Sequence, residues 1–111
     1  MIRAAIAAFV FVAAAPVQAH HAGRAVTATV YDGWYHGRTT ACGTTYQHWG
    51  TSAAHPWLEC GTQVRVTYRG RSITVPVTDR CDCAALDLSA GAAHRLGVPL
   101  NGTATVRISH R

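Results

Sequence analysis

Polar and apolar residues alternate along most of the chain after residue 25. The alternating, β-branched segments are 26–31, 62–68, 72–78 and 103–109. Because successive side chains of a strand point to opposite faces, this period of two predicts half-buried β-strands. The segment 61–67 also resembles 102–109 with one residue inserted. Two related strand units predict a small, pseudo-symmetric barrel.

The second and third of these strands are predicted to form a β-hairpin. Arg69-Gly70-Arg71 supplies the turn between them. Pairing Tyr68 with Ile73 across that turn brings Cys60 close to Cys81. The hairpin therefore links the strands to the cysteine-containing loops.

The rest of the chain predicts little helix. One helix is predicted over 88–96, where Ser89 can cap the start, apolar residues recur on one face, and Gly97 ends it. The residues 52–55 predict a single further helical turn. Between 34 and 50 the chain is rich in Gly, Thr and aromatic residues without a sustained period. This composition predicts a long functional loop.

The N-terminus has the layout of a secretory signal peptide. A short positive start precedes an apolar core over 4–15, and Pro16-Val17-Gln18-Ala19 supplies small residues for a signal peptidase. We therefore expect cleavage after Ala19, a flexible leader over 20–24 and one domain over 25–111. The apolar core is shorter than the roughly 20 residues that span a bilayer, and no cysteine follows the cleavage site to carry a lipid. The product is expected to be secreted or periplasmic, without a membrane anchor.

The cysteines predict crosslinks. Removing 19 of the 111 residues leaves 92, and so small a domain has a thin core. In an oxidising compartment its four cysteines predict two disulfides. Their spacing lacks the two CxxC pairs typical of a four-cysteine metal site, so no metal is expected. A Cys81–Cys83 link would close a very small, strained ring and ranks lowest, whereas the sequence does not choose between pairing Cys42 with Cys81 or with Cys83. The set is Cys42, Cys60, Cys81 and Cys83.

The charge of the chain is positive. All ten basic residues are arginines, and losing Arg3 leaves nine against five acids, a formal charge of +4 before histidines are counted. That charge suits an anionic partner such as a cell wall, and it equally suits ordinary solubility. An exported chain without a basic run is not expected to bind nucleic acid. The sequence indicates no cofactor, and we expect a monomer.

The strand over 72–78 ends in a candidate catalytic acid, Asp79. A carboxylate at the end of a rigid strand, beside crosslinked loops, is well placed for chemistry. Pro76 cannot donate to a sheet ladder, which predicts an edge or a bulge that re-aims Asp79. The structural alternative is an aspartate that accepts hydrogen bonds from turn amides.

Five short motifs recur in the order found in one known family. They are Tyr35-His36-Gly37-Arg38-Thr39-Thr40-Ala41, Thr51-Ser52-Ala53-Ala54-His55, Gly61-Thr62-Gln63-Val64-Arg65-Val66, Thr78-Asp79-Arg80 and Leu86-Asp87-Leu88-Ser89. From about residue 25 to 109 the chain resembles the RlpA-like (rare lipoprotein A) double-psi β-barrel domain. Its cysteine pattern is similar to that of the barwin, expansin and loosenin-like branch of this barrel.

The resemblance implies a mainly β fold, a six-stranded double-psi β-barrel with one or two short helices and a polysaccharide groove over one face. RlpA-like proteins are implicated in lytic transglycosylation of peptidoglycan glycan strands stripped of peptides, which is the first expectation for this chain. Two alternatives stay open. One is a non-catalytic module that binds or loosens cell-wall glycan, as expansins do. The other is a secreted cysteine-protease inhibitor of the barwin-like type, which would use a loop such as 34–50.

The resemblance also implies roles for single residues. Asp79 matches the family's principal acid, which is expected to protonate the glycosidic oxygen and then take a proton from the sugar's own hydroxyl. His55 matches a family histidine expected to orient Asp79 or to bind a sugar hydroxyl, with a packed structural histidine as the alternative. Thr44 is expected to contact the substrate. It stands where RlpA-like proteins usually carry glutamate, and this difference strengthens the hypothesis of a non-catalytic glycan-binding module. Nothing in the sequence places Asp32 or Glu59 opposite Asp79.

Arg80 and aromatic residues of the loop-rich half are also expected to contact the substrate. Arg80 would favour the ionised form of Asp79 if their side chains met, but neighbours on a strand point to opposite faces. Asp87 precedes the predicted helix and is expected to satisfy its free amides. Four aromatic residues in the loop-rich half can stack on sugar faces or plug the barrel ends: Trp34, Tyr35, Trp49 and Trp57.

Overall fold

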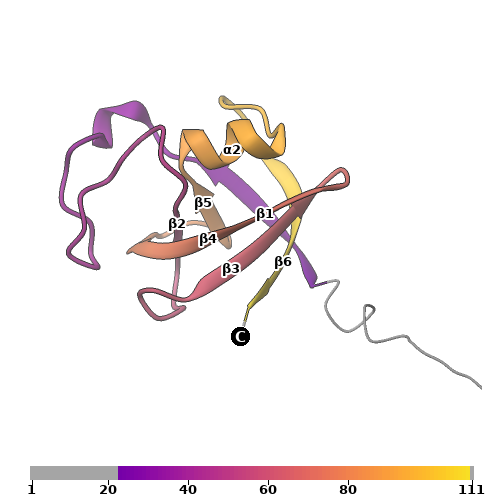
Figure 1. Cartoon of the computed structure of the whole chain (residues 1–111), viewed down its shortest axis with the longest axis horizontal. Coiled ribbons are helices and arrows are strands. Elements are labelled where there is room, and N and C mark those ends of the chain that lie inside the picture. The colour runs from indigo at the N-terminus through magenta and orange to yellow at the C-terminus, as the bar shows by residue number, and fades with distance from the viewer. Residues whose placement is uncertain (1–22, 111) are drawn as a thin grey trace, which may run out of the picture.

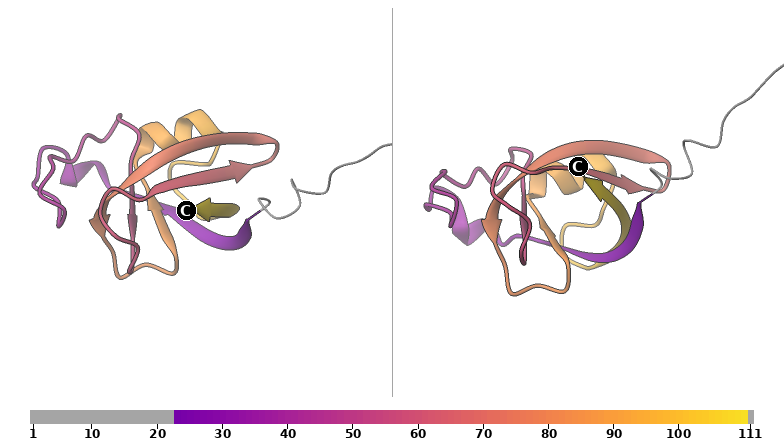
Figure 2. Two further views of the ribbon diagram at one scale, coloured as in Figure 1. Left: turned by 60° about the horizontal axis from the view of Figure 1, so that its bottom comes forward. Right: turned by 90° about the horizontal axis from the view of Figure 1, so that it is seen from below.

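The chain folds as a closed β-barrel. The structure is a computed structural model that describes residues 23–110, and the segment predicted to be a signal peptide lies outside them. Six strands close a mixed barrel in the order β1-β5-β2-β4-β3-β6 (Figures 1 and 2). The elements are β1 (Arg24–Val30), η1 (Gly33–Tyr35), β2 (Ala53–His55), β3 (Gln63–Tyr68), β4 (Arg71–Arg80), β5 (Leu86–Leu88), α2 (Ala90–Leu96) and β6 (Ala104–His110). The six-stranded, mainly β barrel predicted from the sequence is confirmed, and β1 begins one residue before the predicted domain start.

The alternation of the sequence fills the barrel interior. In β3, exposed and buried residues take turns from Gln63 to Val66, and β6 repeats the pattern around Val106 and Ile108. The inward-facing side chains are small and aliphatic, and their burial is the main favourable contribution to folding. The core includes Ala28, Val64, Val66, Val75, Val77, Leu86, Leu88, Val106 and Ile108.

The β3–β4 hairpin forms with a different register from the predicted one. Tyr68 pairs with Arg71 and not with Ile73, so the predicted pairing is wrong by two residues. The two-residue turn is possible because Arg69 and Gly70 adopt φ values of 46° and 83°, the positive values that a type I′ turn requires. A shift of two residues keeps every side chain on its predicted face, so the core is unaffected.

Two short strands replace parts of the predicted helices. Residues 52–55 do not form a helical turn, since Ala53–His55 is β2, which lies between β4 and β5 and is buried throughout. Leu88 ends β5, so the predicted helix begins two residues later, at Ala90. Its caps are as predicted: Ser89 accepts a hydrogen bond from the amide of Ala92, and Gly97 ends the helix in a left-handed conformation. Tertiary pairing outweighs local preference in such short segments.

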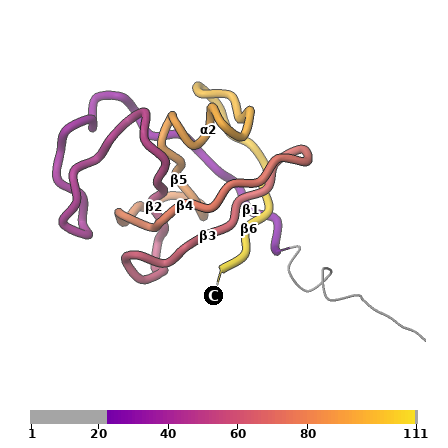
Figure 3. Tube along the Cα trace, in the orientation of Figure 1, coloured from indigo at the N-terminus to yellow at the C-terminus, as the bar shows by residue number. Residues whose placement is uncertain are grey.

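The long loop between β1 and β2 projects beyond one end of the barrel (Figure 3). Helix α2 packs closely against its end, because a Cβ on Gly91 would lie 2.3 Å from the carbonyl oxygens of Trp49 and Gly50. Glycine is therefore required at this contact. Among the described residues, no helix has the length and apolar character needed to cross a membrane.

Candidate active site

A bulge at the end of β4 orients Asp79. In the pairing of β2 with β4, Ala53 faces Val77 and Ala54 faces Asp79, so Thr78 is an extra residue on β4. The irregularity predicted before Asp79 is present, but at Thr78 and not at Pro76. Bulges re-aim the side chains that follow them, and here the bulge precedes the Asp79 carboxylate.

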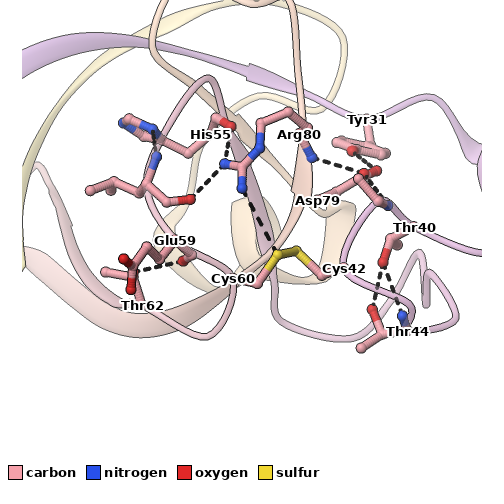
Figure 4. Close-up of a disulfide and its surroundings, with 12 residues drawn as sticks. Tyr31, Thr40, Cys42, Thr44, His55, Glu59, Cys60, Thr62, Asp79 and Arg80 are labelled. Carbon is pink, nitrogen blue, oxygen red and sulfur yellow. Dashed lines mark hydrogen bonds between the residues drawn. A yellow bond between two sulfur atoms is a disulfide. The ribbon is translucent and has the colours of Figure 1, made fainter.

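Three donors hold the Asp79 carboxylate. The Tyr31 hydroxyl donates to Oδ2 over 2.5 Å, and the amides of Ala41 and Arg80 each donate to Oδ1 over 2.8 Å (Figure 4). Tyr31 follows β1, whereas Ala41 belongs to the long loop. The carboxylate is thus fixed from three separate segments of the chain. This is the preorganisation that a catalytic or binding group requires.

The Asp79 carboxylate lines an open hollow of about 320 Å³. A second carboxylate, that of Asp87, lines the same hollow from β5. Because β5 and β4 flank β2 in the barrel, these two side chains approach from different strands. The lining residues are Tyr31, Tyr35, Asp79, Arg80, Cys81, Asp82, Cys83 and Asp87.

Asp87 was expected to satisfy the helix amides, and this expectation is wrong. Ser89 caps α2, while Asp87 Oδ1 accepts a hydrogen bond from the Thr29 hydroxyl over 2.9 Å. Burial raises the pKa of Asp87, the charge of Asp79 raises it further, and the bond from Thr29 opposes the rise. The environment of Asp87 therefore makes this carboxyl a weaker acid than an ordinary aspartate. The alternation Leu86-Asp87-Leu88 was a signal for a strand that places this carboxylate outward.

Tyr31 is a further site residue that the sequence reasoning missed. Its ring packs against Tyr35 and Tyr46, with centroid distances of 5.6 Å and 4.6 Å. Burial and the hydrogen bond to Asp79 raise the pKa of Tyr31 far above its ordinary value. Tyr31 therefore keeps its proton at physiological pH and stays a donor to Asp79.

His55 does not reach Asp79. It is 2% exposed, and it is absent from the residues that line the hollow. Its Nδ1 accepts hydrogen bonds from the amides of Trp57 and Leu58, over 3.2 Å and 3.1 Å. Figure 4 shows the His55 ring and Asp79 on opposite sides of the Arg80 side chain. The geometry supports the structural alternative, in which His55 shapes the β2–β3 loop, and not the predicted assistance to Asp79.

His55→Ala is expected to lower the free energy of unfolding by about 2–4 kcal/mol, since it leaves a cavity and two amides without their acceptor. His55→Asn, whose Oδ1 can replace Nδ1 as acceptor, is expected to recover part of this loss. Burial lowers the pKa of His55. The stabilisation is therefore complete above about pH 6.5 and is lost as the pH falls through the folded-state pKa. Urea unfolding from pH 7.5 to 5 measures both effects, and equal stability of the Ala and Asn variants would contradict the structural role.

Arg80 is held by the β2–β3 loop. Its guanidinium donates to the carbonyl oxygens of His55 and Leu58, over 3.0 Å and 2.5 Å. Arg80 lines the hollow, yet its strong contacts are with the protein. Its position is consistent with the predicted substrate contact, and its hydrogen bonds tie the wall of the hollow to the loop that follows β2.

The disulfide pairing is neither of the two that the sequence left open. Cys42 pairs with Cys60 and Cys81 with Cys83. The latter link was ranked lowest, but the two Cα atoms lie 5.1 Å apart, within the normal range for a disulfide. The former pairing follows from the position of the long loop, which lies beside the β2–β3 loop. Among residues 23–110, no group of three or more potential metal ligands gathers.

Of the remaining predicted substrate contacts, one is among the residues that line the hollow. Tyr35 lines it, whereas the exposed Thr44 bonds to Thr40, with 2.8 Å between the two hydroxyl oxygens. Asp32 accepts a hydrogen bond from the Trp34 amide and caps η1. Three tryptophan residues are 65%, 64% and 63% exposed, so none plugs the barrel; these residues are Trp34, Trp49 and Trp57.

Comparison with known proteins identifies the family. The family model described as lytic transglycolase matches residues 27–108. The chain belongs to the RlpA-like lytic transglycosylase family. It is 44% identical to the uncharacterized protein ssl3177 of Synechocystis sp. over 87 residues, which cover 77% of this chain and 96% of the relative. The endolytic peptidoglycan transglycosylase RlpA of Pseudomonas aeruginosa is 41% identical over 87 residues, 74% of this chain and 26% of the relative. The chain thus spans about a quarter of the length of this RlpA relative.

Two solved structures are similar to the RlpA-like barrel of this chain. The Streptomyces papain inhibitor has a TM-score of 0.59 and 32% sequence identity, with 78% of this chain and 94% of that chain covered. Cerato-platanin 3 from M. perniciosa has a TM-score of 0.61 at 18% identity, with coverages of 79% and 94%. At that identity the second likeness concerns the fold alone. The predicted resemblance to the RlpA-like double-psi barrel is confirmed.

Proposed function

We propose that this chain is an exported protein that remodels the cell wall by cleaving peptidoglycan glycan strands as a lytic transglycosylase. Three carboxylates line the open hollow, and the observation that carries the proposal is that two of them, Asp79 and Asp87, are held in different ways. Membership of the RlpA-like family and the name of the Pseudomonas relative support the substrate.

Asp87 is the proton carrier in this mechanism. Its protonated carboxyl gives a proton to the glycosidic oxygen, and the bond between that oxygen and the anomeric carbon breaks. The Asp87 carboxylate then takes the proton of the same sugar's 6-hydroxyl, whose oxygen bonds to the anomeric carbon. The products are a 1,6-anhydro end and a free hydroxyl end, no water is consumed, and Asp87 regains its starting form.

Asp79 stabilises the positive charge that develops at the anomeric carbon. This division of roles differs from the expectation that Asp79 itself transfers the proton. The Asp79 carboxylate already accepts three hydrogen bonds from the protein, whereas Asp87 accepts one from the Thr29 hydroxyl and is half-buried near Asp79. Tyr31 positions Asp79 and takes no part in proton transfer.

The purified protein is expected to release fragments with 1,6-anhydro ends from peptide-stripped glycan strands, detected by mass spectrometry. Strands that pellet with the protein but stay intact would contradict cleavage. They would support instead the non-catalytic expansin- or loosenin-like module, which the glutamate-to-threonine difference at Thr44 favours. An equal amount of heat-unfolded protein is the control.

A second candidate function is inhibition of a cysteine protease. The Streptomyces papain inhibitor supports it, because 94% of that chain aligns with this barrel at 32% identity. The long loop projecting beyond the barrel, with its exposed Trp34 and Trp49, would provide the contact surface. Titration of papain with micromolar protein tests it, and full protease activity at saturation would exclude it.

A further inference from the structure

A second hollow, of about 570 Å³, lies at the end of β1. The turn into η1 forms one side, His48 of the long loop contributes, and the segment 100–103 before β6 forms the rest. Tyr31 lines both this hollow and the one that contains the carboxylates. The two hollows are therefore neighbours with Tyr31 between them.

The second hollow has the lining of a site for an uncharged sugar. Hydroxyl and amide groups come from Thr29, Asn101 and Thr103, and the exposed Leu100 adds an apolar surface. Asp32 is the one acidic side chain in the lining, and it already accepts the Trp34 amide. The lining contains no arginine or lysine, and His48 is its one basic side chain. Its several neutral donors and acceptors suit a polyhydroxylated ring.

The residues that line the second hollow also hold the two carboxylates. The Thr29 hydroxyl donates to Asp87, and the Tyr31 hydroxyl donates to Asp79. Both donors belong to β1 or follow it directly, and both line the second hollow. A sugar in this hollow would thus contact the supports of the reacting pair.

We propose that the second hollow is a sugar subsite. It binds an uncharged sugar unit of the same glycan strand that crosses the carboxylates, and Asn101 and Thr103 are its polar contacts. The proposal rests on the proposed function, because it requires a glycan ligand. Its consequence is that affinity rises with strand length once a strand is long enough to enter both hollows.

Calorimetric titration with peptide-free glycan of two and of six sugar units tests the subsite. An Asp87→Asn background prevents cleavage of the ligand. Adding Asn101→Ala and Thr103→Val is expected to weaken binding of the six-sugar strand about 25-fold, about fivefold for each lost hydrogen bond. Binding of the disaccharide is expected to stay unchanged. Thr105→Val is the matched control, since it makes the same chemical change on β6, where Thr105 pairs with Thr27 outside the hollow.

The outcomes separate this proposal from the function on which it rests. If the six-sugar strand binds the Asn101 and Thr103 variant as tightly as the background protein, the subsite is refuted and the glycan function stands. If Thr105→Val weakens binding equally, the loss is not specific to the hollow, and the subsite is also refuted. If the background protein binds neither glycan, the proposed function itself fails.

Discussion

Asp87→Asn is expected to lower the rate of glycan cleavage at least about 100-fold, because it removes the group that donates and accepts the proton. Binding of glycan is expected to persist, since the asparagine oxygen can still accept the hydrogen bond from the Thr29 hydroxyl. Single-turnover cleavage measured beside a binding assay separates the two effects. If an Asp87→Asn variant produced anhydro ends at the wild-type rate, the assignment of Asp87 would be wrong. Asp79 would then be the residue that transfers the proton.

The pH dependence of cleavage tests the same assignment, through two variants that change the pKa of Asp87 in opposite directions. The reaction needs protonated Asp87, so the rate falls as the pH rises through the pKa of this residue. Thr29→Val removes the hydrogen bond that lowers the pKa of Asp87 and is expected to shift this decline to higher pH. Asp79→Asn removes a charge that raises the pKa of Asp87 and is expected to shift the decline of its residual activity to lower pH. Shifts in the same direction would contradict the assignment.

Replacing Cys42 and Cys60 together by serine is expected to lower the free energy of unfolding by about 3 kcal/mol. The disulfide joins residues 18 apart, and removing it restores the chain entropy of an unfolded loop of that length. Guanidinium unfolding of the oxidised protein and the variant measures the difference. Cleavage is also expected to fall while the barrel is still folded, because Cys42 follows Ala41, whose amide holds Asp79.

The other disulfide provides the comparison for this prediction. Cys81 and Cys83 are two positions apart, so replacing both by serine frees a much shorter loop and is expected to cost less stability. Equal losses in the two double variants would show that loop length does not govern the effect.

Local patterns were sufficient for the long strands and for the helix caps. Alternation located β1, β3, β4 and β6 because each has one face in the core, and Ser89 and Gly97 set the ends of α2 through their own backbone contacts. Asp79 was recognisable as a candidate because a polar run interrupts an apolar strand. These features depend on residues close together in the chain, which is the information that a single sequence contains.

Only the tertiary structure places the Asp79 and Asp87 carboxylates in the same hollow. The strands β2 and β5 have three residues each, too few for a period, and they become strands only because neighbours on both sides supply hydrogen bonds. Their placement brings Asp87 into the hollow with Asp79 and carries the His55 ring away from it. Sequence patterns alone were enough to predict a crosslinked β-barrel with an acid at the end of a strand. Closure of the barrel, which joins residues 48 and 58 positions apart through Tyr31–Asp79 and Thr29–Asp87, decided which groups share the site.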